Sequence, residues 1–188
     1  MFELIGSVLL LICVAAAGVS IVWYTVRNDI SPMPTSPKVK RVLLDALEQR
    51  TVRGRIFELG SGWGTLAFAL ARRFPRCDVL AFENSPVPYM VSRWRQALFP
   101  RPNLSLRRTD FLRFSLSDAD AVVCYLYPGG MARLREPFER ELRPGTLVIS
   151  NTFAVPGWTP EQVVQAADLY RTKVFVYRVG VFDHNCSG

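Results

Sequence analysis

Residues 55–64 read RIFELGSGWG, a short apolar run followed by three glycines at alternating positions. The apolar run, residues 55–59, has the length and composition of a buried strand. Glycine adopts backbone angles that other residues avoid, so the glycines predict a tight turn that a ligand can approach closely. Residues 65–74 follow with the apolar spacing of a helix and end before Pro75. This order of strand, glycine turn and helix is typical of the first unit of an α/β fold.

The same alternation of strand and helix continues along the chain. We expect further strands at residues 78–83, 104–109, 121–126 and 146–150, with one or two more within 171–181. Helices are expected at residues 38–49, 87–98 and 131–142. Apolar strands that alternate with helices form a mostly parallel sheet covered on both faces. The sequence therefore predicts an α/β, Rossmann-like domain.

An acidic residue, Glu58, stands just before the glycine turn. Turns that bind dinucleotides follow the pattern G-x-G-x-x-G, in which the third glycine comes three positions after the second. Here Gly64 comes only two positions after Gly62, which itself follows Gly60, and dinucleotide folds usually keep an apolar residue in place of Glu58. Both differences favour a cationic ligand, because a carboxylate attracts positive charge. The sulfonium and amino groups of S-adenosylmethionine meet this requirement.

Two further acids are expected at the ends of neighbouring strands. Glu83 closes the second strand, where a carboxylate can accept hydrogen bonds from both hydroxyls of a ribose. Asp110 closes the third strand, where a short acid can accept from an adenine amino group, and Phe111 can stack beside the ring. Three acids beside one glycine turn predict an S-adenosylmethionine site. A nicotinamide-dependent reductase, which would also use Glu83, and a catalytically silent membrane scaffold are the alternatives.

The N-terminal residues 4–26 contain no charged side chain. As a helix, this stretch is long enough to cover the ~30 Å hydrocarbon core of a bilayer. Trp23 and Tyr24 fall at one end of it, where aromatic rings favour the membrane interface. A cleaved signal peptide is the alternative, since residues 15–18 are small, but only Glu3 precedes the apolar stretch and a cationic n-region is missing. The sequence therefore predicts a retained transmembrane anchor whose partner is the lipid bilayer.

Cationic residues follow the apolar stretch instead of preceding it. They are Arg27, Lys38, Lys40 and Arg41. The positive-inside tendency then predicts a single-pass protein of the inner (cytoplasmic) membrane, with its catalytic domain on the cytoplasmic side. We divide the chain into an anchor (residues 1–27), a proline-rich connector (28–37) and an S-adenosylmethionine-binding domain (38–188).

The net charge of +7 is compatible with a nucleic acid, anionic lipid or an acidic substrate surface as the partner. The 23 Lys and Arg residues form no run of five or six, which argues against nucleic acid. No metal site is expected, because Cys13, Cys77, Cys124 and Cys186 are far apart and His184 is the single histidine. We expect free thiols and an exposed histidine in the C-terminal tail.

Five segments between residues 33 and 178 resemble a known family. They are residues 33–35 (MPT), 58–62 (ELGSG), 92–95 (SRWR), 109–111 (TDF) and 153–158 (FAVPGW). The pattern resembles the single-domain lysine methyltransferases of mitochondria that modify the adenine nucleotide translocase and the ATP synthase c-subunit, together with their bacterial relatives. The chain departs from the family pattern at Trp63, Ser85 and Gly157.

The resemblance implies a class I methyltransferase that acts on a lysine of a membrane protein. A lipid, a quinone or a small molecule is the alternative acceptor. On the acceptor side, Tyr127, in the segment that leaves the fourth strand, and Trp158 are candidates, with plain packing in the core as the alternative. The complete set of expected cofactor-binding residues is Thr35, which the resemblance adds, with Glu58, Gly60, Gly62, Gly64, Glu83, Asp110 and Phe111.

Overall fold

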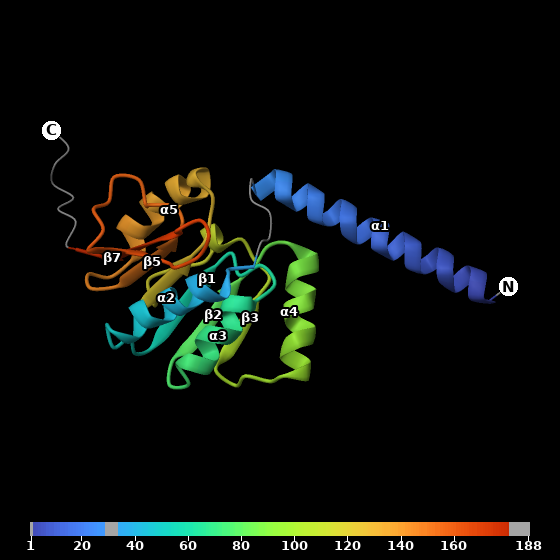
Figure 1. Cartoon of the computed structure of the whole chain (residues 1–188), viewed down its shortest axis with the longest axis horizontal. Helices are drawn as coiled ribbons and strands as arrows, with labels where there is room; N and C mark the ends of the chain where they lie inside the picture. Colours follow the sequence, from blue (N-terminus) through green and yellow to red (C-terminus); the bar gives the residue numbers. More distant parts are fainter. Residues whose placement is uncertain (1, 29–33, 181–188) are drawn as a thin grey trace.

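The chain folds around one seven-stranded sheet (Figure 1). The structure is a computed structural model, and it describes residues 2–28 and 34–180. The strands are β1 (Arg55–Leu59), β2 (Asp78–Phe82), β3 (Leu104–Arg107), β4 (Ala121–Cys124), β5 (Leu147–Asn151), β6 (Gln162–Gln165) and β7 (Lys173–Arg178). Their spatial order is β3-β2-β1-β4-β5-β7-β6. The first five run parallel, whereas β7 runs antiparallel to both of its neighbours. The predicted Rossmann-like fold is confirmed.

Helices cover both faces of the sheet. They are α2 (Pro37–Glu48), α3 (Thr65–Arg73), α4 (Pro86–Leu98) and α5 (Pro128–Glu141), with a short 3-10 helix at Phe111–Arg113. Successive strand residues point to opposite faces. Ile56 therefore packs with α2 and α3, while its neighbour Phe57 packs with α5. Each face has its own apolar core, which explains why the central parallel strands are mostly apolar.

The sheet edge formed by β6 and β7 differs from the prediction. Residues 171–181 are predicted to hold one or two strands, and they hold β7, with Val181 lying outside the described residues. The partner strand β6 pairs antiparallel with β7, and the sequence pattern does not predict it. Its two valines stand between glutamines, and Val163 is exposed. An edge strand of this kind has no apolar run by which it could be recognised.

Three parallel strands end slightly earlier than predicted. β2 ends at Phe82, β3 at Arg107 and β4 at Cys124, in each case shortly before the expected end. The acids Glu83 and Asp110 consequently lie in loops beyond the carboxyl ends of the strands. Loops in this position carry ligand-binding residues on a rigid scaffold.

The N-terminal helix α1 (Phe2–Asn28) projects from the domain (Figure 1). Residues Ile5–Val26 are long and apolar enough to cross a membrane, and none of the most apolar window is buried in the structure. The core helix of a soluble protein would be mostly buried, so α1 is not a helix of that kind. The half of α1 nearer its C-terminus lies beside α4.

The predicted connector lies partly outside the described residues, which exclude 29–33. Its described end leads into α2, which begins at Pro37. The Oγ atom of Ser36 accepts a hydrogen bond from the Val39 N–H at 3.3 Å and so caps the helix. Proline suits the first helical position because it lacks the N–H that would have no partner there.

The cysteines of the described residues are free thiols. Cys13 is exposed in α1, whereas Cys77 and Cys124 are buried in the domain. Burial raises the pKa of Cys124 to about 12, so its thiol stays protonated and unreactive at neutral pH. Cys186 and His184 lie outside the described residues.

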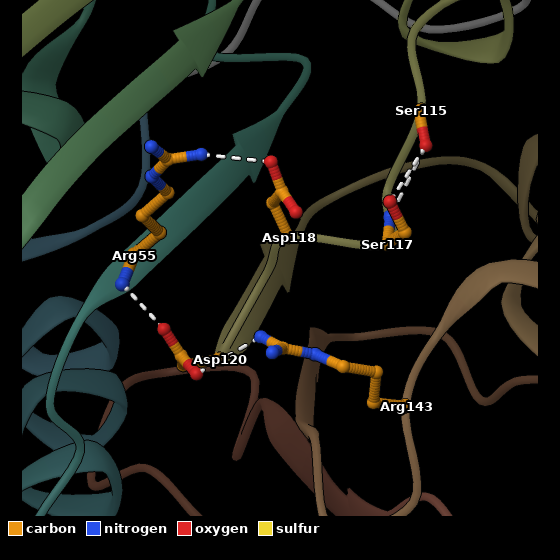
Figure 2. A network of polar contacts seen from close by, with 6 residues as sticks. All are labelled: Arg55, Ser115, Ser117, Asp118, Asp120 and Arg143. Carbon is orange, nitrogen blue, oxygen red and sulfur yellow. Dashed lines mark hydrogen bonds and ion pairs between the residues drawn. The ribbon is translucent and has the colours of Figure 1, made fainter.

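A network of polar contacts joins the amino ends of β1 and β4, opposite the glycine turn (Figure 2). Asp120 accepts a hydrogen bond from the Arg55 backbone N–H at 2.7 Å and another from the Arg143 guanidinium at 3.2 Å. The Arg55 guanidinium also pairs with Asp118 at 2.8 Å. Gly54 has a positive φ of 92°, and a Cβ atom at this residue would clash with the Asp120 carboxylate. The network holds the start of β1 against β4.

We expect Asp120→Ala to destabilise the protein by about 1–2 kcal/mol, because the Arg55 N–H loses its acceptor. For a domain of this size, the melting temperature should fall by about 2–8 °C, which thermal unfolding followed by circular dichroism would measure. Asp118→Ala is the matched control: its side chain is 68% exposed, and an exposed ion pair contributes little. Equal losses in both variants would contradict the role assigned to Asp120.

Candidate functional site

A cavity of about 330 Å³ lies beside the glycine turn, at the carboxyl ends of the parallel strands. Its volume falls at the lower end of the range for small-molecule sites. The expected cofactor-binding residues that line it are Thr35, Glu58, Gly60, Gly62, Glu83, Asp110 and Phe111. The remaining one, Gly64, is not among the lining residues. The structure thus brings together residues that are up to 76 positions apart in the sequence, from Thr35 to Phe111.

The three glycines of the turn have different roles. All have positive φ angles, 77° at Gly60, 53° at Gly62 and 71° at Gly64, which side chains rarely tolerate. A Cβ atom at Gly62 would meet nothing within 4 Å, so this residue leaves open space at the cavity. A Cβ atom at Gly64 would lie 2.7 Å from the Oγ of Ser92 in α4. Gly64 therefore allows α4 to pack closely, which explains why it does not line the cavity.

Glu83 fastens the glycine turn to the end of β2. Its Oε2 accepts a hydrogen bond from the Gly62 N–H at 2.7 Å, and its Oε1 accepts one from the Ser85 N–H, also at 2.7 Å. The side chain is buried. Each carboxylate oxygen has two lone pairs, so both can still accept from a ligand. The sequence predicts a ribose contact for Glu83 but not this second role, since no pattern shows which loop an acid will touch.

Glu58 is a buried acid at the end of β1. Its Oε2 has no hydrogen-bond partner among the described residues. Burial, and secondly the nearby charge of Glu83, raise the pKa of Glu58 well above the usual carboxyl range. A buried acid without a partner is costly unless a ligand supplies one. The arrangement fits a ligand with a positively charged group.

Asp110 and Phe111 form the third side of the cavity. Asp110 caps the 3-10 helix Phe111–Arg113, and its Oδ1 accepts a hydrogen bond from the Leu112 N–H at 3.0 Å. Both residues are half-buried, which leaves the carboxylate and the ring accessible from the cavity. This position is compatible with the predicted contact to an adenine ring.

Three tyrosines line the same cavity: Tyr24 from α1 and Tyr125 and Tyr127 from the loop after β4. The ring of Tyr127 lies against the first turn of α5, where Gly129 and Gly130 make room for it. A Cβ atom at Gly129 would lie 2.5 Å from the Cε2 atom of this ring. The two glycines therefore keep Tyr127 in place at the cavity.

Trp158, the other acceptor-side candidate, is not brought to the cavity. It packs against Phe138 and Tyr177 with ring centroids 5.9 and 5.8 Å away. Its Nε1–H donates to the Oε1 of Glu139 at 3.1 Å. These contacts correspond to the packing role that the sequence left open for it.

The sequence does not predict that the anchor helix reaches the site. Ser20, Ile21, Tyr24 and Thr25 of α1 line the cavity. Ser20 and Tyr24 are four positions apart, as are Ile21 and Thr25, so the four residues share one face of the helix. The sequence does contain one sign of this contact: polar residues are confined to one face at the end of an apolar helix.

The described residues contain no group of three or more His, Cys, Asp or Glu side chains that could hold a metal ion. The features that remain are an acid without a partner, an open glycine turn and two further acids. Together they fit S-adenosylmethionine, whose methionine end is cationic and whose ribose and adenine offer hydrogen-bond donors.

Comparison with protein-family models gives one match. The model described as the ANTKMT methyltransferase domain matches residues 58–162, more than half of the chain. The matched region begins at Glu58 and includes the glycine turn, Glu83, Asp110 and Tyr127.

Curated relatives of the chain carry lysine methyltransferase names. The chain is 26% identical over 155 residues to a protein-lysine N-methyltransferase of Saccharolobus islandicus (strain REY15A), covering 79% of this chain and 92% of the relative. It is 29% identical over 114 residues to the adenine nucleotide translocase lysine N-methyltransferase of Mus musculus, covering 59% of this chain and 48% of the relative. The chain therefore spans about half the length of the mouse relative.

Among solved structures, the fold is similar to the crystal structure of an RNA methyltransferase from Salinibacter ruber in complex with S-adenosyl-L-homocysteine. The TM-score is 0.67 at 25% sequence identity, and the match covers 79% of this chain and 94% of the other.

Proposed function

This chain belongs to the ANTKMT methyltransferase domain family and uses S-adenosylmethionine, and on that basis we propose that it is a membrane-anchored protein-lysine N-methyltransferase. One observation carries the proposal: a single cavity joins three strand-end acids, three tyrosines and the end of an apolar helix. Family membership also decides against a nicotinamide-dependent reductase.

The residues of the cavity divide into a cofactor side and an acceptor side. We assign Glu58 to the cationic methionine end, Glu83 to the ribose hydroxyls, and Asp110 with Phe111 to the adenine. Gly62 allows close approach, because a Cβ atom there would meet nothing within 4 Å, and Thr35 also lines the cavity. The bound cofactor supplies an electrophilic methyl group on its sulfonium. The chain aligns the acceptor with that group and excludes water, which requires no covalent catalytic residue.

The three tyrosines support an amine as the acceptor. A lysine ammonium must lose a proton before its nitrogen can attack, and a dry pocket favours the neutral amine. Aromatic faces attract the cationic form on arrival, and the hydroxyls can hold the nitrogen in place. Tyr24 from α1 and Tyr125 and Tyr127 from the loop after β4 provide such an environment. The protein-lysine and translocase-lysine names of the two curated relatives agree with this assignment.

The end of α1 in the cavity supports a retained anchor over a cleaved signal peptide, because removal of the helix would take away one wall of the site. Arg27 and the lysines that follow favour a cytoplasmic position for the domain. A cavity next to the end of a membrane span would receive acceptors at the membrane surface. We therefore propose a lysine of an integral membrane protein, near the cytoplasmic face, as the substrate.

The proposal can be tested on membranes from cells that lack the protein. The purified full chain and isotope-labelled S-adenosylmethionine are added, and the labelled species are identified by mass spectrometry of proteins and lipid extracts. Label on a lysine of a membrane protein is expected. Label confined to a lipid, a quinone or a small molecule would refute the lysine assignment and leave the methyltransferase intact. Absence of any label in every fraction would favour a catalytically silent scaffold.

The role of Tyr127 can be tested separately. Tyr127→Phe should slow methyl transfer by roughly three- to tenfold with unchanged cofactor affinity, because the lost hydroxyl holds the acceptor and not the cofactor. Single-turnover rates and calorimetry measure the two quantities. Tyr170→Phe is the control, since Tyr170 is exposed and does not line the cavity. Equal rates in the wild type and Tyr127→Phe would leave Tyr127 with a packing role.

Glu58 makes cofactor binding depend on pH. Its pKa is raised in the free protein by burial first and by Glu83 second, and a cationic ligand favours the ionised form. Binding therefore releases a proton, and affinity should rise with pH from the ordinary carboxyl range up to the raised pKa of Glu58. The free energy of unfolding has the opposite dependence on pH. The stability that the protonated Glu58 carboxyl contributes is present at low pH and is lost as pH rises through its raised pKa.

Calorimetry over a pH series, below the pH at which the cofactor's own amino group titrates, would measure this effect. Glu58→Gln should flatten the dependence of affinity on pH. Glu141→Gln is the control, since the Glu141 carboxylate accepts a hydrogen bond from the Leu116 N–H and does not line the cavity. A Glu58→Gln protein that keeps the full slope would show that another group releases the proton.

A further inference from the structure

Helix α4 exposes its apolar residues and buries its small ones. Met90, Trp94 and Leu98 are four positions apart and form one stripe along the helix, and all three are exposed, Trp94 by 64% and Leu98 by 74%. The buried residues of α4 are Pro88 and Ser92. A helix on the surface of a soluble domain shows the reverse arrangement. The outer face of α4 therefore has the character of an interface.

The same corner of the domain carries most of the net positive charge. Residues 84–117 contain six arginines and one acid, Asp110, which gives a net charge of +5 out of +7 for the whole chain. They include α4 and β3, the edge strand beside it. Among the described residues, none of these six arginines forms a salt bridge, whereas about half of the arginines elsewhere in the domain do.

The exposed face of α4 is continuous with the candidate membrane span. The half of α1 nearer its C-terminus lies beside α4 (Figure 1). Both helices have exposed apolar side chains. Phe99, just after α4, extends the apolar surface and is also exposed. A surface with exposed aliphatic and aromatic residues, flanked by arginines and joined to a membrane span, matches what an anionic bilayer surface attracts.

We propose that α4 and Phe99 lie on the bilayer as a second membrane contact, with the surrounding arginines at the phosphates of anionic lipids. The proposal rests on the anchor assigned to α1 in the proposed function. Trp94 is suited to the interface because an indole ring prefers the level of the headgroups. Met90 and Leu98 are aliphatic and the surface adjoins the candidate membrane span, so lipid is favoured over nucleic acid for the same arginines.

This contact would set the height of the active site above the membrane. The N-terminal end of α4 lies at the cavity, where Ser85 and Pro88 line it. Tyr24 of α1 lines the same cavity. Two elements that both touch the bilayer thus border the cavity and hold its entrance at the headgroups. An acceptor lysine is then selected by its depth relative to the membrane surface as well as by the residues that surround it in its own protein.

The test uses the full chain reconstituted into vesicles. An environment-sensitive fluorophore is attached at position 98 through Leu98→Cys, with Cys13→Ser and Cys186→Ser to remove other reactive thiols. Quenching by a lipid-borne nitroxide is then measured in phosphatidylcholine vesicles with and without phosphatidylglycerol. Leu169→Cys is the matched control, because Leu169 is 89% exposed and lies next to the opposite edge of the sheet, between β6 and β7.

Quenching at position 98 is expected to exceed that at position 169 several-fold, and to increase with phosphatidylglycerol. Arg93→Gln with Arg107→Gln should remove this increase, whereas Arg140→Gln, in the exposed part of α5, should not. Equal, weak quenching at both positions in a chain that resists carbonate extraction would overturn the α4 contact and leave the anchor intact. Extraction by carbonate with strong quenching at position 98 would overturn the anchor alone.

A competition experiment decides between lipid and nucleic acid. Single-stranded RNA is added to the labelled, vesicle-bound chain, and quenching at position 98 is expected to persist. Loss of quenching at low RNA concentration, prevented by Arg93→Gln with Arg107→Gln, would overturn the proposal in favour of an RNA surface.

Discussion

Replacing Glu83 with alanine is expected to lower the affinity for S-adenosylmethionine by about one hundredfold. The Glu83 carboxylate accepts hydrogen bonds from the Gly62 and Ser85 N–H groups, so its loss releases the glycine turn as well as the ribose contact. Charge-assisted hydrogen bonds contribute about 1.5–3 kcal/mol each, and the loss of one corresponds to roughly ten- to a hundredfold. Calorimetry on the folded variant would measure the change.

Asp120→Ala is the informative control for Glu83→Ala. Asp120 also accepts a hydrogen bond from a strand backbone, but at the opposite ends of the strands (Figure 2). Its replacement should lower the melting temperature and leave cofactor affinity unchanged. If both variants lost affinity equally, the effect of Glu83 would reflect general destabilisation of the fold and not a specific site.

Removal of residues 1–33 is expected to reduce methylation of a membrane-embedded acceptor by about 10²–10⁴-fold. A tether that confines enzyme and acceptor to one surface raises their effective concentration by this order. The rate would be measured on vesicles that contain the acceptor, with acceptor in detergent as a reference that is independent of the tether. A rate on vesicles that does not change would contradict the anchor.

A chimaera separates the two contributions of α1. An unrelated single-span helix fused before Pro34 restores the tether but not Ser20, Tyr24 and Thr25, which line the cavity. Partial recovery would show that these side chains contribute to the site. Complete recovery would show that α1 acts as a tether alone.

The fold could be predicted well because its central parallel strands are buried on both faces and are therefore mostly apolar. Short runs such as 55–59 and 121–124 therefore predict buried strands. β6 could not be predicted, since it lies at an exposed edge and needs only backbone hydrogen bonds to pair with β7. Patterns of side chains carry little information about such a strand.

The cofactor side of the site was predictable for a related reason. The carboxyl ends of parallel strands meet at one edge, so acids that follow successive strands, Glu58, Glu83 and Asp110, come together. The position of α1 was not predictable in this way. Nothing in its own sequence shows which loop Tyr24 will approach, because that depends on the path of the chain between the helix and the domain. The sequence predicts a ligand contact for Gly64. In the structure Gly64 lies against Ser92 instead, and only the packing of α4 shows this contact.

The hydrogen bonds from Gly62 and Ser85 to Glu83 also bear on the kinetics of ligand binding. Both bonds join groups of the chain itself, so no ligand group is needed to fix the conformation of the glycine turn. The conformational entropy of ordering this loop is then lost during folding and does not oppose association. We then expect association to be limited by diffusion into the cavity and by the orientation of the ligand. Differences in affinity between related ligands would arise mainly in their dissociation rates.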